Sequence, residues 1–487
     1  TTIIATSTGG SIDANSTDLT AATSVTLTAK DEVDVGLEAA TSATISAGGT
    51  THSRIDDAFA ATLTSLSLSG NATSHTFDIT DAEGVASITI TGDQDVTVGA
   101  SAADLELLDT QLSLVDNSSA VSTLRLGTSS GSLDLSSVAA DIIEIAINNH
   151  EKTVTVASGA NVIFAVDQSA TTIDGPDSTA SSNTVTVTLD DKATLWNSSV
   201  DIVTSLTLTD FKTATIDVSK DSFDGPYYSF PTSNISGLNA SASNTDVTIE
   251  AGMNGVTLGT TVDTGTGTLT INSSGGVHLG VTDILSGGLV VTGSGDVWSN
   301  GLRMSNVSNV TTGSGRDTLT FVDLDADASV KTNAGDDTIK LSGNTSLGMS
   351  VTINGGEGWD TLSVGDNNLD LNNGRSFVLE NIESIKIANG VTDLVVGGEL
   401  LNESTFVLEH EGYSPTFNLM VEMGTGTILD LSKMEINPLG LTTASSITVD
   451  ASHQTENLLL TGVDGIQNNF TAGSGDRKST RLNSSHQ

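Results

Sequence analysis

Three stretches of the chain share one spacing of glycine, aspartate and an apolar residue. They are Thr312-Gly-Ser-Gly-Arg-Asp-Thr-Leu-Thr320, Thr332-Asn-Ala-Gly-Asp-Asp-Thr-Ile-Lys340 and Gly355-Gly-Glu-Gly-Trp-Asp-Thr-Leu-Ser363. They converge on the pattern G-G-x-G-x-D-x-U-x, where U is a large apolar residue. Glycines let the backbone turn tightly, and the apolar residue two places after the aspartate starts a strand that points into a core. Each stretch therefore encodes one turn followed by one strand.

The turns recur at a fixed interval. A glycine stands at every twentieth position at Gly255, Gly275, Gly295, Gly315 and Gly335, and the next equivalent, Gly358, is displaced by a three-residue insertion. Valines share this interval at Val290, Val310 and Val330, with Ile353 as the equivalent after the insertion. Two strands and two turns in a repeat of this length predict an all-β fold, a parallel β-solenoid with about 20 residues per coil. The valines would then form an inward-facing column.

Apolar residues alternate with Ser and Thr along most of the chain, as in Ser24-Val-Thr-Leu-Thr-Ala29. This alternation predicts strands. The first half is less regular, although Leu66-x-Leu68-x-Gly70 recurs one coil length later as Ile88-x-Ile90-x-Gly92. Scarce Trp and Pro favour a solenoid there too, and a series of antiparallel β-sandwich modules is the alternative.

Composition divides the chain into five segments. We expect a Ser/Thr-rich strand region at 1–222, a loop or boundary rich in Pro and Tyr at 223–244, the regular solenoid at 245–365, further solenoid at 366–475 and a tail at 476–487. The tail resembles a translated sequencing adapter, so we interpret it as non-biological and expect it to pack against nothing. The chain is then a fragment of a longer protein.

Charge restricts the partners of this protein. The 60 acidic and 17 basic residues give a net charge of −43. Such a chain repels nucleic acid and anionic membrane surfaces, and divalent cations are its natural partners. There is no cysteine and no run of about 18 apolar residues, so we expect no disulfide and no membrane span.

The nonapeptide pattern resembles the calcium-binding repeat of RTX-type bacterial secreted surface proteins, notably S-layer proteins and large adhesins. The resemblance covers about 50 residues. It implies a calcium ion between equivalent turns of successive coils. Asp317 with Asp337 would flank one ion, and Asp337 with Asp360 would flank a second.

The resemblance also implies that backbone oxygens of the turns complete each site. The residues concerned are Gly313, Gly315, Asn333, Gly335, Gly356 and Gly358. Only the third copy matches the pattern fully, because Thr312 and Asn333 replace glycines in the first two. Trp359 would lie on the outer surface. The alternative is a Gly/Asp turn that stabilises a solenoid corner without metal.

Motifs for catalysis are weak. No H-E-x-x-H motif occurs, and no two of the histidines outside the tail have metal-ligand spacing. Paired carboxylates on adjacent coils could still cleave glycosidic bonds without a local motif. We therefore expect a non-enzymatic protein, with a polysaccharide-acting β-solenoid enzyme (a lyase, epimerase or glycosidase), or the RTX portion of one, as the alternative.

The resemblance implies secretion in one step, folding outside the cell when calcium binds, and a place at the cell surface. An extracellular structural or adhesive protein is thus the expected function. Its expected partners are calcium, copies of itself in a surface lattice, or cell-surface polysaccharide.

Overall fold

The computed structural model describes most of the chain. The described residues are 1–14, 19, 21–49, 52–56, 63–71, 73–82, 85–101, 112–127, 132–146, 153–165, 168–176, 182–189, 201–219, 233–253, 255–283, 287–304, 308–324, 327–347, 350–365, 369–371, 376–401, 405–411, 417–423, 427–437, 445–455, 458–464, 466–472 and 477–480. The chain divides into two compact units, Thr1–Asn254 and Gly255–Gln487. We call them the N-terminal and C-terminal units.

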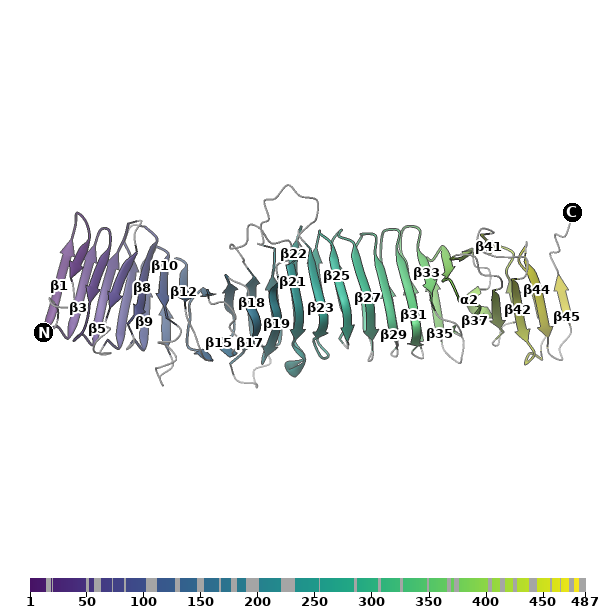
Figure 1. The fold of residues 1–487 in the computed structure, drawn as a ribbon, viewed down its shortest axis with the longest axis horizontal. Helices are drawn as coiled ribbons and strands as arrows, with labels where there is room; N and C mark the ends of the chain where they lie inside the picture. The colour runs from purple at the N-terminus through teal and green to yellow at the C-terminus, as the bar shows by residue number, and fades with distance from the viewer. Residues whose placement is uncertain are drawn as a thin grey trace. The chain divides into compact units, whose positions relative to one another are not determined.

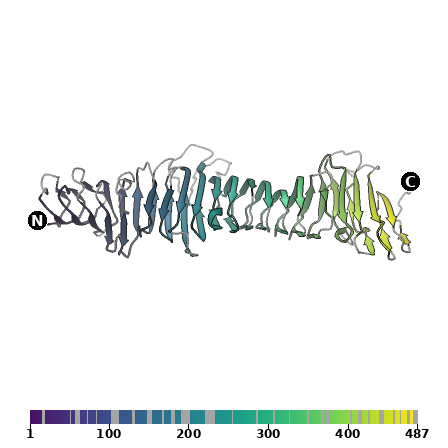
Figure 2. The ribbon, with the colours of Figure 1, turned by 90° about the horizontal axis from the view of Figure 1, so that it is seen from below.

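Both units are parallel β-solenoids with coils of about 23 residues. Each coil contributes strands to different sheets, and the arrows within a sheet run in the same direction (Figures 1 and 2). The constant interval of the glycines holds only for part of the C-terminal unit. The β-sandwich alternative for the first half is wrong, because the strands there pair in parallel with strands one coil away.

The N-terminal unit has three sheets. The first contains β1 (Thr2–Ser7), β3 (Ser24–Ala29), β5 (Ser42–Ala47), β7 (Ser65–Gly70), β9 (Ser87–Thr91) and β11 (Ser113–Asp116). The second contains β2 (Ile12–Ala14), β4 (Val33–Gly36), β6 (Ser53–Asp56), β8 (His75–Asp81), β10 (Val96–Ala100), β12 (Ser122–Leu126), β14 (Ile142–Ile145), β16 (Ala160–Phe164), β18 (Thr184–Leu189), β20 (Thr213–Asp217) and β22 (Asp246–Gly252). The third contains β13 (Leu133–Leu135), β15 (Thr153–Val156), β17 (Gln168–Asp174), β19 (Asp201–Thr209) and β21 (Ser233–Asn239), and the 3-10 helix η1 (Ser241–Ser243) follows.

The C-terminal unit begins with two sheets. One contains β23 (Val256–Asp263), β25 (Val277–Asp283), β27 (Val297–Met304), β29 (Thr318–Leu324), β31 (Thr338–Leu347), β33 (Thr361–Val364), β36 (Ser384–Ile387), β38 (Val407–His410) and β41 (Glu435–Ile436). The other contains β24 (Leu269–Ser273), β26 (Leu289–Thr292), β28 (Ser308–Thr311), β30 (Ala328–Lys331), β32 (Ser350–Asn354) and β35 (Ser376–Glu380).

Two further sheets follow in the same unit. They are β34 (Leu369–Asp370), β37 (Asp393–Gly397), β39 (Asn418–Glu422), β42 (Ser446–Ala451) and β44 (Gln467–Ala472), and then β40 (Ile428–Asp430), β43 (Leu458–Thr461) and β45 (Arg477–Thr480). A single helical turn, α2 (Gly398–Leu401), follows β37.

Alternation places one apolar column per strand inside the coil. Leu66 pairs with Ile88 and Leu68 with Ile90, as the recurrence of their motif predicts, and all four side chains are buried. In the C-terminal unit the column Leu319, Ile339, Leu362, Ile385 and Leu408 is likewise buried. Such columns fill the narrow interior without aromatic side chains.

The predicted valine column needs one correction. Val310, Val330 and Ile353 pair in register, but the partner of Val310 on β26 is Leu289. The coil from Leu289 to Val310 is longer by one residue than the coil from Val310 to Val330, and a shift of one residue turns a side chain to the opposite face of the strand. Leu289 is therefore buried and Val290 only partly so.

The segment boundaries also differ from expectation. The units divide between Asn254 and Gly255. Within the expected loop 223–244, residues 233–239 form β21 and pair with β19, whereas 223–232 lie outside the described residues.

The expectation that the tail packs against nothing is wrong for Arg477–Thr480, which pair in parallel with β43 as β45. The physical reason is that an edge strand offers backbone N–H and C=O groups, which any sequence can pair with.

Candidate functional site

Four acidic residues form a column at the start of the strands in the C-terminal unit. Asp317, Asp337, Asp360 and Glu383 directly precede β29, β31, β33 and β36. The strands pair in the register Thr318, Thr338, Thr361 and Ser384, so the residues before them stack one coil apart. We call these four residues the acidic ladder.

Each carboxylate of the ladder accepts a hydrogen bond from a backbone N–H of the preceding coil. The pairs are Val297 N to Asp317 Oδ1 at 2.8 Å, Asp317 N to Asp337 Oδ1 at 2.7 Å, Asp337 N to Asp360 Oδ1 at 2.9 Å and Asp360 N to Glu383 Oε2 at 2.7 Å. The ladder thus joins five successive coils through side-chain oxygens, at the corner where the turn meets the strand.

The second oxygen of each aspartate has a different environment. Asp317 and Asp360 are fully buried and Asp337 is 1% exposed. Among the described residues, Oδ2 of each of these three side chains is buried and has no hydrogen-bond partner. A buried carboxylate that is only partly paired is costly, because burial removes the water that would otherwise solvate its charge.

This burial changes the acidity of the ladder. Burial, with smaller contributions from the charges of neighbouring acidic residues, raises the pKa of Asp317 to about 7 and the pKa of Asp360 to about 6. Burial also raises the pKa of Asp337, which has Asp336 and Asp296 nearby. The aspartates are therefore stabilised either by a proton or by a cation at the same oxygens.

The glycines of the motif stack beside the ladder. A Cβ added to Gly335 would lie 2.1 Å from the carbonyl oxygen of Gly315, and one added to Gly358 would lie 1.9 Å from that of Gly335. The same close approach joins Gly313 to Gly293 and Gly315 to Gly295. The carbonyl oxygens of this column approach the glycine of the next coil so closely that a side chain there would collide with them. Glycine is therefore required at these positions.

The three departures from the pattern, at Thr312, Thr332 and Asn333, have local explanations. Asn333 has φ of 65°, a left-handed conformation that Asn tolerates better than most residues, and the equivalent Gly356 has φ of 104°. The side-chain amide of Asn333 donates to the Thr312 carbonyl oxygen one coil earlier. The hydroxyl of Thr312 donates to the Thr332 carbonyl oxygen at 3.3 Å, and the hydroxyl of Thr332 donates to the Gly355 carbonyl oxygen at 2.8 Å. These substitutions therefore keep the turns connected.

The side chains of the ladder supply only part of the ligand atoms that a bound cation needs. Carboxylate and backbone carbonyl oxygens are the hard ligands that calcium prefers. The three buried Oδ2 atoms supply negative charge that lacks a partner. Among the described residues, however, no group of three or more His, Asp or Glu side chains could hold a metal ion. A cation here would depend on two carboxylates at a time, together with backbone oxygens of the turns.

The structure brings together the predicted Asp317, Asp337 and Asp360, and it adds Glu383, which the motif search missed. The interval from Asp360 to Glu383 equals the interval from Asp337 to Asp360. Two outer aspartates that lie two coils apart, Asp296 and Asp336, also accept hydrogen bonds, from the amides of Arg316 at 2.8 Å and Trp359 at 2.9 Å. Trp359 is 52% exposed, as predicted.

Comparison of the chain with family models, with curated proteins and with solved structures gave no match. Within the described ranges, no helix has the length and apolar character needed to cross a membrane.

Proposed function

We propose that this protein is an extracellular structural or adhesive cell-surface protein whose C-terminal unit is stabilised by calcium bound between coils. The observation that carries the proposal is the acidic ladder, with its three buried oxygens that lack partners among the described residues. A calcium ion would supply the positive charge that these oxygens need.

The residues that would hold calcium are the aspartates and the adjacent turns. Asp337 belongs to two successive steps of the ladder, because it accepts from the Asp317 amide and donates its own amide to Asp360. Backbone oxygens from Gly313, Gly315, Asn333, Gly335, Gly356 and Gly358 would complete the ligand set. A net charge of −43 further favours the accumulation of divalent cations near the protein.

A solenoid that folds fully only where calcium is abundant suits a protein that works outside the cell. Its repeated coils serve a structural or adhesive role through extended sheet surfaces rather than through one deep site. Neither role needs a catalytic residue in the ladder.

Thermal unfolding of the full chain with calcium, with magnesium and with chelator tests the proposal. Calcium at about 100 times its dissociation constant should stabilise the folded state by about 2.7 kcal/mol per site. Magnesium should substitute poorly, because it requires tighter octahedral geometry and retains its waters. Three coincident unfolding curves would show that the ladder is a metal-free corner and that the proposal is wrong.

A further inference from the structure

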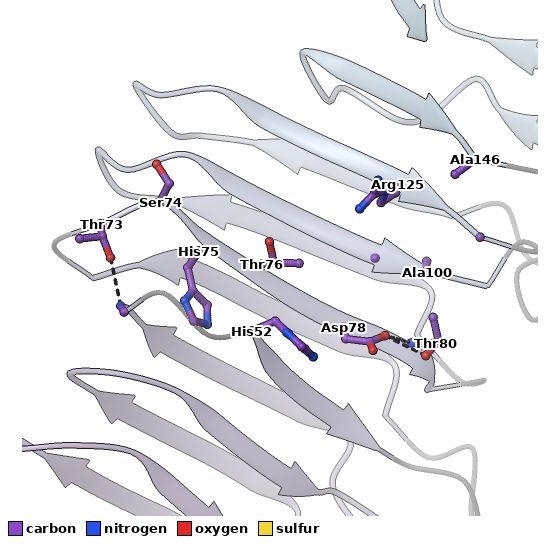
Figure 3. Close-up of a pocket in the computed structure, with 13 residues that line it drawn as sticks. His52, Thr73, Ser74, His75, Thr76, Asp78, Thr80, Ala100, Arg125 and Ala146 are labelled. Atoms are coloured by element: carbon purple, nitrogen blue, oxygen red, sulfur yellow. Dashed lines mark hydrogen bonds between the residues drawn. The ribbon is translucent and has the colours of Figure 1, made fainter. Parts of the chain in front are cut away.

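A groove with both polar and apolar lining crosses the outward face of the second sheet in the N-terminal unit, over β8, β10 and β12 (Figure 3). Its volume of about 800 Å³ lies in the range of small-molecule binding sites. Hydroxyl, carboxylate, imidazole and guanidinium groups line it, together with glycine and alanine. The groove shares no residue with the acidic ladder.

The floor of the groove is a glycine between two charged side chains. Gly99 on β10 pairs with Asp78 on β8 on one side and with Arg125 on β12 on the other. Neighbouring strands are about 4.8 Å apart, so Asp78 and Arg125 are separated by about 10 Å across a position without a side chain. This gap forms the hollow.

The fold does not require glycine at position 99. A Cβ there would approach no atom closer than 3.8 Å, and Gly99 is not among the glycines with positive φ. Glycine inside a strand weakens the strand, because it adds conformational entropy to the unfolded chain and contributes no packing. The stacked glycines of the C-terminal unit are required because a Cβ would collide with the neighbouring coil. No such collision explains Gly99, and its structural effect is the hollow in the sheet surface.

The charges of the groove favour a neutral ligand. Arg125 pairs with Glu144 at 2.9 Å, so its guanidinium is not an unbalanced cation that would attract an anion. Asp78 accepts hydrogen bonds from the Thr80 amide at 3.1 Å and the Thr80 hydroxyl at 2.8 Å. Among the described residues, no group of three or more His, Asp or Glu side chains that could hold a metal ion lies in the groove.

One residue at the edge of the groove, His75, is directed away from it. His75 is 4% exposed, and its Nε2 lies 2.8 Å from Ser53 Oγ. Its Nδ1 is buried and has no hydrogen-bond partner among the described residues. The ring lies on the inward face of β8 with Phe77, so this atom belongs to the interior of the coil and is not a contact for a ligand in the groove.

We propose that this groove binds a neutral oligosaccharide. Sugar hydroxyls both donate and accept, and they match a lining that mixes a carboxylate, a guanidinium, the imidazole of His52 and threonine hydroxyls. Gly99 lets the sugar ring approach the sheet between Asp78 and Arg125. The proposal gives the adhesive role a ligand class, but the groove does not depend on calcium, so the two proposals can fail separately.

The test is binding of the full chain to an array of neutral and acidic oligosaccharides, followed by calorimetry with the neutral oligosaccharide that is best retained. Both are done in chelator and repeated in calcium. We expect retention of neutral oligosaccharides in both buffers. Gly99→Thr, which fills the floor, and Arg125→Gln should each weaken binding by at least about tenfold, or about 1.4 kcal/mol.

Two controls separate binding from folding. Lys212→Gln removes a cation that is about as exposed as Arg125 and is also ion-paired, with Asp246, but that does not line the groove, so affinity should stay within about twofold. Gly99→Thr should melt at the same temperature as the parent or higher, because threonine favours strands. The proposal is overturned if no neutral oligosaccharide is retained, if acidic ones are preferred, or if Gly99→Thr binds as tightly as the parent.

Discussion

Two runs of coils, one in each unit, are joined by different chemistry at the corner before a strand. In the N-terminal unit, hydroxyls of Thr23, Thr41 and Thr64 donate to the carbonyl oxygens of Thr1, Thr23 and Thr41, at 3.3, 3.0 and 3.1 Å. We call this the hydroxyl ladder. In the C-terminal unit the acidic ladder links the coils instead, through backbone amides that donate to carboxylates.

The comparison shows that stacking coils does not require charge. The hydroxyl ladder joins coils with neutral groups that do not titrate at ordinary pH. The acidic ladder makes similar bonds, but it also buries three carboxylate oxygens without partners among the described residues. Acidic residues at this corner therefore make stability depend on solution conditions, and this dependence is what distinguishes the two ladders.

The largest effect should come from filling the glycine column of the C-terminal unit. Gly358→Ala places a Cβ 1.9 Å from the Gly335 carbonyl oxygen, at a residue whose φ is 138°. Overpacking and backbone strain together should destabilise this unit by about 2–4 kcal/mol, measured by urea unfolding. Gly99→Ala is the matched control and should change stability by no more than about 0.5 kcal/mol. Equal effects of both variants would contradict the distinction between required and unrequired glycines.

Removal of the central carboxylate should rank next. In excess calcium, Asp337→Ala should cost about 2–3 kcal/mol, because it leaves the Asp317 amide unpaired and removes a ligand from both proposed sites. Asp317→Ala should cost less. Asp336→Ala changes the exposed neighbour and serves as control in the same melting experiment. A larger loss for Asp336→Ala than for Asp337→Ala would show that the outer aspartates, not the ladder, carry the calcium response.

The dependence of stability on pH should differ between the two ladders even when no metal is present. A carboxyl whose pKa is raised on folding adds stability below its unfolded pKa, near 4, and loses that stability as pH rises through its folded pKa. With folded values of about 7 for Asp317 and about 6 for Asp360, the C-terminal unit in calcium-free buffer should be more stable at pH 5 than at pH 7.5. The difference should be about 1–3 kcal/mol, read as the shift of its melting transition.

Asp337→Asn tests whether the buried charge causes this dependence on pH. The amide oxygen still accepts from the Asp317 N–H, while the buried charge is removed. The variant should therefore be at least as stable as the parent at pH 7.5 without calcium, and it should respond less to calcium. A variant that loses stability in calcium-free buffer would indicate that the charge itself stabilises the ladder.

The smallest effect should come from the hydroxyl ladder. Thr41→Val keeps the branched shape and removes one bond to the Thr23 carbonyl oxygen at an exposed corner. The loss should be about 0.5–1 kcal/mol in thermal unfolding and should be the same with calcium and with chelator. A calcium-dependent loss would mean that the two ladders are not independent.

The sequence predicted the fold and most of the acidic ladder because one turn motif recurs once per coil. Equal spacing in a stacked repeat becomes proximity in space, so Asp317, Asp337 and Asp360 could be placed together from their numbers alone. Glu383 was missed because no glycines surround it and the acidic residue type changes there. Val290 was misplaced because one extra residue in its coil reverses which face is buried.

The groove could not be predicted, because its residues have no common spacing. The interval from Asp78 to Gly99 is shorter than the interval from Gly99 to Arg125. Only the paired register of β8, β10 and β12 places them in a row. Residues that are neighbours in space can therefore be recognised from the sequence where coils have constant length, but not where coil length varies.

The regular repeat of the ladder has a consequence for how such a chain changes over generations. Val297, Asp317 and Asp337 occupy the same position in successive coils of equal length. Loss of residues 317–336 would join Arg316 to Asp337 and offer the Val297 amide a new carboxylate in the same place. A change of a few residues can be absorbed without losing the columns beyond it, as the step from Asp337 to Asp360 shows, which is three residues longer than the step before it and keeps the register. Insertions and deletions of whole coils should thus preserve the ladder without local adjustment, whereas shorter ones need a bulge or a longer turn to restore the register.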